Sequence, residues 1–180
     1  MTRYAALLRG VNVNGITVKS TELAALFRDL GFTGVKTVLA SGNVLFETDE
    51  GGTPTGHSAL KTHIEKALGE RFGYDAWIVL VEHDDLAGIV DGYPYPEVDD
   101  RQPYVVFFSD PSVREEVLAA AAALAPDAAL PERAEAGPTV VYWEVPKGSS
   151  TDTALSKFLA KSSFKATTTT RNLRTLRKLL

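Results

Sequence analysis

The order of the hydrophobic patterns in the first half of the sequence constrains the fold more than any other feature. Short apolar runs predict strands, and stretches with an apolar residue every three or four positions predict helices. The expected strands are 3–9, 35–40, 44–47 and 76–81, and the expected helices are 20–30 and 58–72. This β-α-β-β-α-β order is that of a ferredoxin-like unit. Right-handed crossovers then predict an antiparallel sheet with the strand order 4-1-3-2.

Local signals mark where several of these elements begin and end. Ser20 is expected to be the N-cap of the first helix, and Gly31 is expected to end that helix. Ser41-Gly42-Asn43 separates two β-rich runs and predicts a hairpin turn. The stretch 48–56 contains a Gly-Gly pair and Pro54, and we expect it to be a mobile loop.

The second half of the sequence repeats the pattern with less regularity. Strands are expected at 104–108, 129–134, 139–145 and 165–169, and helices at 83–90, 113–124, 153–161 and 172–180. The predicted fold class is therefore α+β, with two fused ferredoxin-like halves, residues 1–90 and 91–180, and a C-terminal helix. The second half is interpreted as a duplicated copy of the first. The pattern leaves open whether the two sheets join at an edge.

The stretch Leu8 to Gly15 is the best candidate for a binding loop. Gly10 and Gly15 bracket Asn12 and Asn14, and both residue types accept unusual backbone conformations. In the predicted topology this loop, the start of the first helix and the 41–43 turn meet at one edge of the sheet. A helix N-terminus attracts anions, so this edge is a candidate anion-binding site.

The candidate ligand-binding residues belong to this loop, the turn and the C-terminal segment. They are Arg9, Gly10, Asn12, Asn14, Ser41, Gly42, Asn43, Lys157, Arg171 and Asn172. Arg9 is expected at the end of the first strand. Its guanidinium can bind phosphate or carboxylate with two hydrogen bonds, or it can form an ion pair that holds the loop to the body of the protein. Likewise, Asn172 can contact a ligand or cap the last helix.

Several chemistries lack support in the sequence. The chain has no cysteine, and its three histidines have no metal-ligand spacing, so disulfides and thiolate sites are excluded and a metal site is not expected. The loop lacks the phosphate-loop and dinucleotide-binding patterns, and Ser41 lacks a nucleophile elbow. No apolar run is long enough for a membrane helix. We therefore expect a cytoplasmic protein.

Charge is distributed unevenly along the chain. Residues 1–146 contain 11 Lys and Arg against 22 Asp and Glu, a net charge of −11. Residues 147–180 contain 8 basic residues and one acidic residue, a net charge of +7. The basic segment can bind a polyanion or dock on the acidic body of the same chain.

Nucleic-acid domains expose aromatic side chains for stacking, whereas Trp77 and Trp143 fall inside expected strands. The acidic body also repels phosphates. We therefore expect weak binding to random duplex DNA. The possible partners are a small anionic ligand or a short single-stranded nucleic acid.

Three motifs carry a resemblance to a known family. They are Leu7-Leu8-Arg9-Gly10-Val11-Asn12-Val13, Ser41-Gly42-Asn43-Val44-Leu45-Phe46, and Thr170-Arg171-Asn172 followed by Lys178-Leu179-Leu180. Together they resemble the domain of unknown function 1697 family over nearly the whole chain. The resemblance implies a bacterial, cytosolic α+β protein of ferredoxin-like character and implies no activity. The chain departs from the pattern at Asn14, where glycine is common, and at Leu173, where tryptophan usually follows Arg-Asn.

The leading hypothesis is a module that binds an anionic ligand, either a nucleotide or nucleic acid, at the edge formed by the loop and the turn. One alternative is an enzyme that acts on a small anionic substrate there, with Arg9 and Lys157 stabilising negative charge. Another is a protein-interaction module. No particular reaction, cofactor or oligomeric state is indicated.

Overall fold

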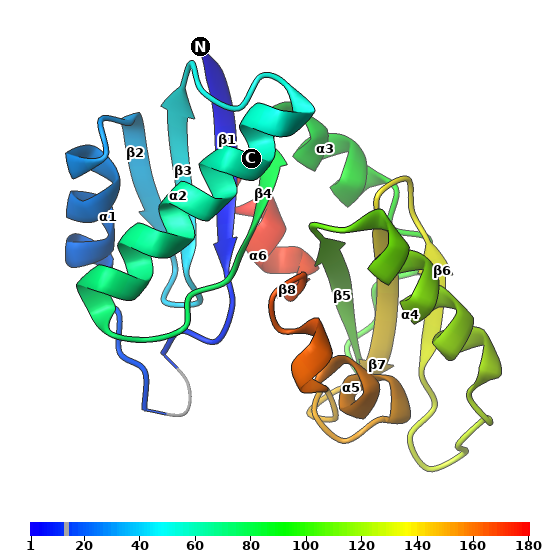
Figure 1. Ribbon diagram of the computed structural model, residues 1–180. Helices are drawn as coiled ribbons and strands as arrows, with labels where there is room; N and C mark the ends of the chain where they lie inside the picture. Colours follow the sequence, from blue (N-terminus) through cyan, green and yellow to red (C-terminus); the bar gives the residue numbers. More distant parts are fainter. Residues whose placement is uncertain (13–14) are drawn as a thin grey trace. The chain divides into compact units, whose positions relative to one another are not determined.

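The computed structural model describes residues 1–12 and 15–180 of the chain. The chain divides into two compact units, residues 1–87 with 178–180, and residues 88–177. Each unit contains a four-stranded antiparallel sheet with strands of its own (Figure 1). No helix in the described residues is long and apolar enough to cross a lipid bilayer.

The first unit has the predicted β-α-β-β-α-β order. Its elements are β1 (Thr2–Leu8), α1 (Ser20–Asp29), β2 (Thr33–Val38), β3 (Asn43–Thr48), α2 (Pro54–Phe72) and β4 (Ile78–Glu82). The strand order across the sheet is β2-β3-β1-β4, which confirms the predicted order 4-1-3-2. The two helices cover one face of this sheet (Figure 1).

Alternating residues of the strands form the core under the two helices. Tyr4, Ala6 and Leu8 of β1 are buried there at every second position, as the two-residue period of a strand requires. Leu60, Ile64 and Leu68 recur every four residues on α2, which places them on one face of the helix. All three pack in the same core cluster. The core therefore holds β1 rigidly up to Leu8, where the candidate loop begins.

Two boundaries differ from those expected. Ser20 is already the first residue of α1, and Lys19 is the N-cap, without a side-chain capping bond. The helix α2 begins at Pro54, inside the stretch expected to be a mobile loop. Thr53 caps it by accepting a hydrogen bond from Gly56 N at 3.0 Å, and proline suits the first position of a helix.

The second unit repeats the topology of the first. The helix α3 (His83–Asp91) leads into it, and its own elements are β5 (Arg101–Phe108), α4 (Pro111–Ala123), β6 (Arg133–Ala136), β7 (Val140–Pro146), α5 (Ala154–Leu159), η1 (Ser162–Phe164), β8 (Thr168–Asn172) and α6 (Leu173–Arg177). The strand order β6-β7-β5-β8 matches that of the first sheet, position by position. The interpretation of the second half as a copy of the first fold is therefore confirmed.

The basic segment forms part of the second sheet. β8 pairs with β5 in antiparallel register, with Arg171 opposite Val105. This strand lies a few residues after the expected position, because η1 and the turn that follows it occupy 162–167. The expected weak strand likewise lies later, at β6.

Candidate functional site

The loop after β1 and the turn between β2 and β3 lie together. Leu8 N donates to Gly42 O at 2.8 Å, and Asn12 Nδ2 donates to Ala40 O at 2.5 Å. A Cβ atom added at Gly42 would lie 2.5 Å from Val11 Cγ2, so only glycine allows the turn to approach the loop this closely. The predicted convergence of loop and turn is confirmed.

Asn12 organises the loop. Its φ is 57°, in the left-handed region that asparagine tolerates better than most residues. Its backbone N donates to Ile16 O at 2.7 Å, and its Oδ1 accepts from Val18 N at 3.0 Å. Asn12 therefore connects the end of β1, the turn and the approach to α1. Asn14 lies outside the described residues.

Asn43 organises the turn in a similar way. Its side chain is fully buried, and its Nδ2 donates to Val38 O and to Ser41 Oγ, each at 2.8 Å. The amides of Asn12 and Asn43, both predicted ligand contacts, thus bind groups of the protein itself. The sequence shows the amides but not which carbonyl groups lie within their reach.

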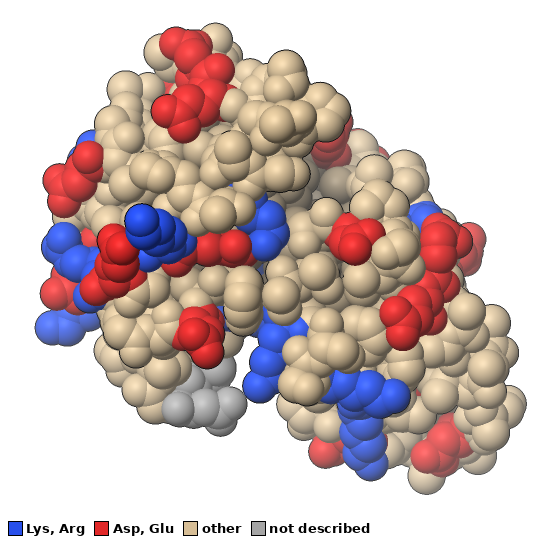
Figure 2. Space-filling model, in the orientation of Figure 1, with Lys and Arg blue, Asp and Glu red and all other residues tan. Residues whose placement is uncertain are grey.

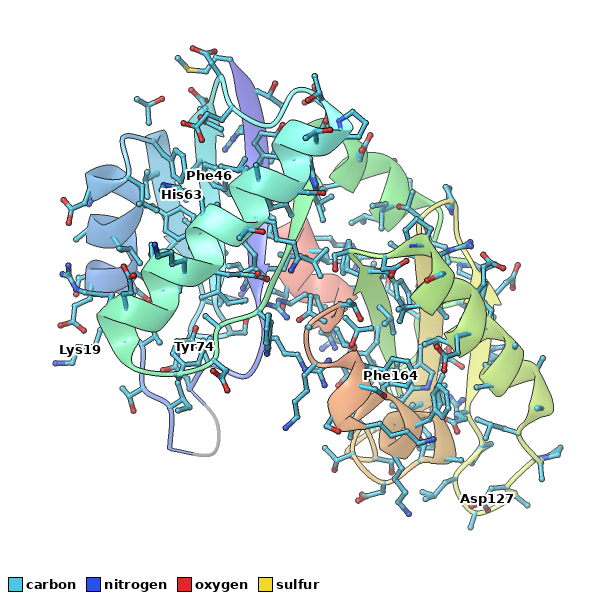
Figure 3. The ribbon with its side chains drawn as sticks, in the orientation of Figure 1. Lys19, Phe46, His63, Tyr74, Asp127 and Phe164 are labelled. Atoms are coloured by element: carbon cyan, nitrogen blue, oxygen red, sulfur yellow. The ribbon has the colours of Figure 1, made fainter. Side chains whose placement is uncertain are left out.

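The start of α1 belongs to the same edge, because Val18 is bonded to Asn12. Lys19, the N-cap, is exposed and contributes no side-chain hydrogen bond to the first turn of α1. The first turn of a helix carries a partial positive charge. Figure 3 shows Lys19 at the end of the first unit where the loop lies.

Arg9 adds a second cation at the point where β1 ends. Its backbone N donates to Trp77 O at 3.0 Å, and its side chain is half-buried. Burial lowers the pKa of Arg9, but a guanidinium remains charged at neutral pH. We call Arg9–Asn12, Lys19 with the start of α1, and residues 41–43 the first-unit edge.

The equivalent edge of the second unit is built differently. Only Ser109 and Asp110 separate β5 from α4, whose first residue is Pro111. Asp110 Oδ1 accepts hydrogen bonds from Ser112 N at 2.9 Å and from Ser112 Oγ at 2.7 Å, and these bonds lower the pKa of Asp110. A carboxylate of the chain therefore occupies the N-terminus of α4.

Arg114 holds the β6–β7 turn of the second unit. Its Nε donates to Val140 O at 3.2 Å, and its Nη2 donates to Gly137 O. The guanidinium thus binds backbone carbonyl groups of the turn. The roles of Asp110 and Arg114 were not predicted from the sequence, although Asp followed by Pro at the start of a helical pattern is a recognisable capping signal.

The remaining predicted site residues belong to the second unit. Lys157 is exposed on α5, whereas Arg171 is buried and donates to Thr169 Oγ1 at 2.7 Å. Burial lowers the pKa of Arg171 to about 10. Asn172 Oδ1 accepts from Arg174 N at 2.9 Å, which supports the capping interpretation. Participation of these residues in the first-unit edge stays a prediction.

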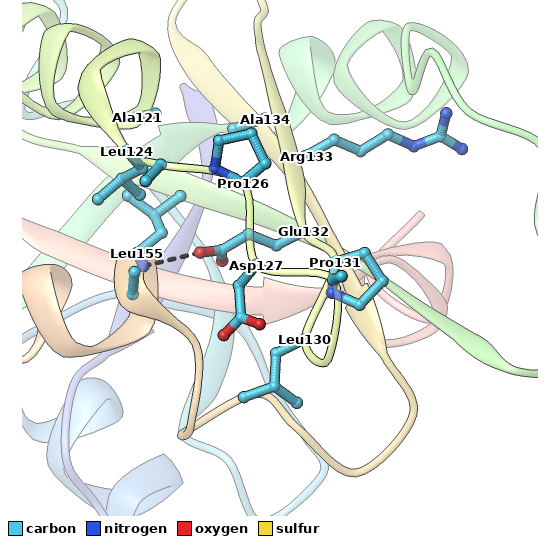
Figure 4. Close-up of a pocket in the computed structure, with 13 residues that line it drawn as sticks. Ala121, Leu124, Pro126, Asp127, Leu130, Pro131, Glu132, Arg133, Ala134 and Leu155 are labelled. Carbon is cyan, nitrogen blue, oxygen red and sulfur yellow. Dashed lines mark hydrogen bonds between the residues drawn. The ribbon is translucent and has the colours of Figure 1, made fainter.

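A cavity of about 370 Å³ lies in the second unit between the end of α4, the loop that follows it and the start of α5 (Figure 4). Its walls are mostly Ala, Leu and Pro side chains. Glu132 Oε1 accepts from Leu155 N at 3.0 Å, and Oε2 accepts from Trp143 Nε1 at 2.9 Å, so this carboxylate has a structural role. None of the predicted site residues that the structure describes lines this cavity. Among residues 1–12 and 15–180, no group of three His, Asp or Glu side chains is arranged to hold a metal ion.

Comparison with known proteins identifies the family and the fold. The conserved bacterial protein SP0830 from Streptococcus pneumoniae has a solved structure with a TM-score of 0.76 and 24% identity, covering 99% of this chain and 96% of that one. An unknown protein from Galdieria sulphuraria has a TM-score of 0.25, 9% identity and coverage of 99% of this chain and 86% of that one, a similarity too low to indicate a shared fold. No curated protein matches the sequence. The model of the family described as "Protein of unknown function (DUF1697)" matches residues 1–142, and the chain belongs to this family.

Proposed function

We propose that this protein binds an anionic ligand, a nucleotide or a short single strand of nucleic acid, at the first-unit edge. The observation that carries the proposal is the contrast between the two helix starts. The N-terminus of α4 receives the carboxylate of Asp110, whereas the N-cap of α1 is Lys19, which provides no acceptor. An external anion at α1 would have the position that Asp110 has at α4.

The charges at the first-unit edge suit a phosphate or carboxylate group. The helix N-terminus and the Lys19 ammonium are both positive, and the Glu22 carboxylate in the first turn of α1 offsets part of this charge. The Arg9 guanidinium can donate two parallel hydrogen bonds to one anion. Asn12 and Asn43 fix the loop and the turn through bonds to the backbone. The ligand therefore meets Asn12 and a turn that are already held by hydrogen bonds, which reduces the entropy lost on binding.

The charge distribution favours a small anion or a short strand over duplex DNA. On the face drawn in Figure 2, Lys and Arg side chains of the first unit lie among Asp and Glu side chains and do not form a continuous basic surface. A duplex would bring many phosphates close to these carboxylates, whereas a single phosphate group at Arg9 would not.

Calorimetric titration with inorganic pyrophosphate and with ATP tests the proposal. We expect Arg9→Ala to weaken the binding of both probes by about tenfold to a hundredfold, as loss of a charged hydrogen-bonding group does. The matched control is Arg28→Ala, which removes the same charge from the last turn of α1, where the side chain is exposed. We expect this control to change affinity by less than about twofold, because distant exposed charges are screened. Equal effects of the two variants, or no binding of either probe at low salt, would overturn the proposal.

A further inference from the structure

Trp77 is an exposed aromatic side chain beside the first-unit edge. It lies one residue before β4 rather than inside a strand, and 37% of it is exposed. The other tryptophan, Trp143, lies in β7, is 3% exposed and donates its Nε1–H to Glu132. The sequence-based expectation that both tryptophans lie inside strands is therefore wrong for Trp77.

The backbone places Trp77 directly opposite Arg9. The last registered pair between β1 and β4 is Leu8 with Ile78, and the hydrogen bond from Arg9 N to Trp77 O extends this pairing by one position. Opposed residues on antiparallel strands have Cβ atoms about 4.5–5.5 Å apart. The indole and the guanidinium therefore start from neighbouring positions at the same end of the sheet.

The surroundings of Trp77 are ordered. Lys61 Nζ lies 6.0 Å from the centroid of the indole ring and forms an ion pair with Glu65. Glu65 Oε1 also accepts a hydrogen bond from Ile78 N at 3.0 Å, which fixes the backbone next to Trp77. The backbone beside the indole is thus fixed, and Lys61 lies near the ring.

A shallow depression of about 440 Å³ adjoins the indole. It lies between α2 and the segment that leads into β4, and Glu70 and Asp75 are among the residues that line it. These carboxylates disfavour a phosphate in the depression. A neutral, flat group fits there better. A nucleic-acid base is such a group, and any of the bases can stack on an indole.

From this juxtaposition we infer that the ligand is a nucleotide unit whose phosphate binds at Arg9 and the start of α1 and whose base stacks on Trp77. The inference rests on the proposed function and adds to it the chemical class of the ligand. A free nucleotide and the residue of a short single strand share this chemistry.

The experiment compares three probes on the wild type, Trp77→Ala and Trp77→Phe: inorganic pyrophosphate, ATP and a short oligothymidylate. We expect Trp77→Ala to weaken ATP and oligothymidylate binding by about tenfold, as loss of one stacking partner does, and to leave pyrophosphate binding unchanged. Trp77→Phe should retain most of the affinity because it keeps an aromatic face. ATP, but not pyrophosphate, should quench the tryptophan fluorescence of the wild type.

The outcomes separate the two proposals. If Trp77→Ala leaves all affinities unchanged while Arg9→Ala lowers them, base stacking is overturned and the anion site stands. If neither ATP nor pyrophosphate binds, or if binding does not depend on Arg9, the proposed function is overturned and the inference with it. Tighter binding of oligothymidylate than of ATP, with dependence on Trp77, supports the inference and indicates a single strand as the ligand. Thermal unfolding of Trp77→Phe is expected to match that of the wild type. This result would exclude misfolding as the cause of any change in the affinity of this variant.

Discussion

The two units have the same strand order but differ where the first strand passes into the first helix. In the first unit this connection is residues 9–19, with Gly10, Asn12 and Gly15 and with Lys19 at the N-cap of α1. In the second unit it is Ser109 and Asp110, and Asp110 caps α4. The short connection demonstrates that the fold does not require a long loop. The first-unit loop is therefore longer than this topology requires. Its cations Arg9 and Lys19, and the absence of a side-chain capping bond from Lys19, are compatible with a binding role.

The close approach of loop and turn in the first unit predicts the largest effect. Gly42→Ala should lower the free energy of unfolding by about 2–4 kcal/mol, because it adds strain at φ +78° and a Cβ 2.5 Å from Val11 Cγ2 and 2.9 Å from Leu8 Cβ. The control is Gly10→Ala, which has a similar φ of +71° but no atom within 4 Å of the added Cβ, and should cost about 1–2 kcal/mol. Urea unfolding measures both. Equal losses would mean that the loop does not pack on the turn.

The hydrophobic periods and the handedness of crossovers were sufficient to predict the strand order of the first sheet and to predict that the second half repeats the pattern, because the core residues of strands and helices recur at fixed spacing. They also predicted that residues 41–43 meet the loop. Other features depend on distances that the sequence does not contain. The amide partners of Asn12 and Asn43 are backbone carbonyls of neighbouring segments. Trp77 is exposed one residue before β4 begins at Ile78, whereas the apolar run in the sequence continues through it. The N-cap was misassigned because Ser20 is a good capping residue by type, whereas the helix starts one residue earlier than that role requires.

The capping residue of the second unit can be transferred to the first unit by a single substitution. Lys19→Asp places a carboxylate at the N-cap of α1, whose φ of −74° and ψ of 137° suit a capping residue. We expect the free energy of unfolding to rise by about 1 kcal/mol and the binding of pyrophosphate to be lost, because the new carboxylate competes for the same backbone N–H groups. Lys19→Ser, which adds a neutral cap, separates capping from charge. Undiminished pyrophosphate binding by Lys19→Asp would place the anion elsewhere.

The pH dependence of Asp110 gives the smallest effect. Hydrogen bonds from Ser112 lower the pKa of Asp110 below its ordinary value of 3.8. A carboxyl whose pKa is lower in the folded state stabilises the protein above the unfolded pKa, and this stabilisation is lost as pH falls through the folded pKa. Asp110→Asn keeps an acceptor oxygen but does not titrate. Its free energy of unfolding should therefore fall less than that of the wild type as the pH drops below the ordinary pKa of 3.8. Parallel pH curves for the two proteins would contradict the capping role.

An amide NMR titration of the full chain with inorganic pyrophosphate shows which of the two helix starts binds an anion. The two helix starts are read in the same spectrum, so each serves as the control for the other. We expect shifts of the amides of Arg9, Gly10, Ser20 and Thr21, and no shift at Ser112 or Val113, where Asp110 already occupies the helix start. Equal shifts at both helix starts, or shifts only in the second unit, would contradict this expectation.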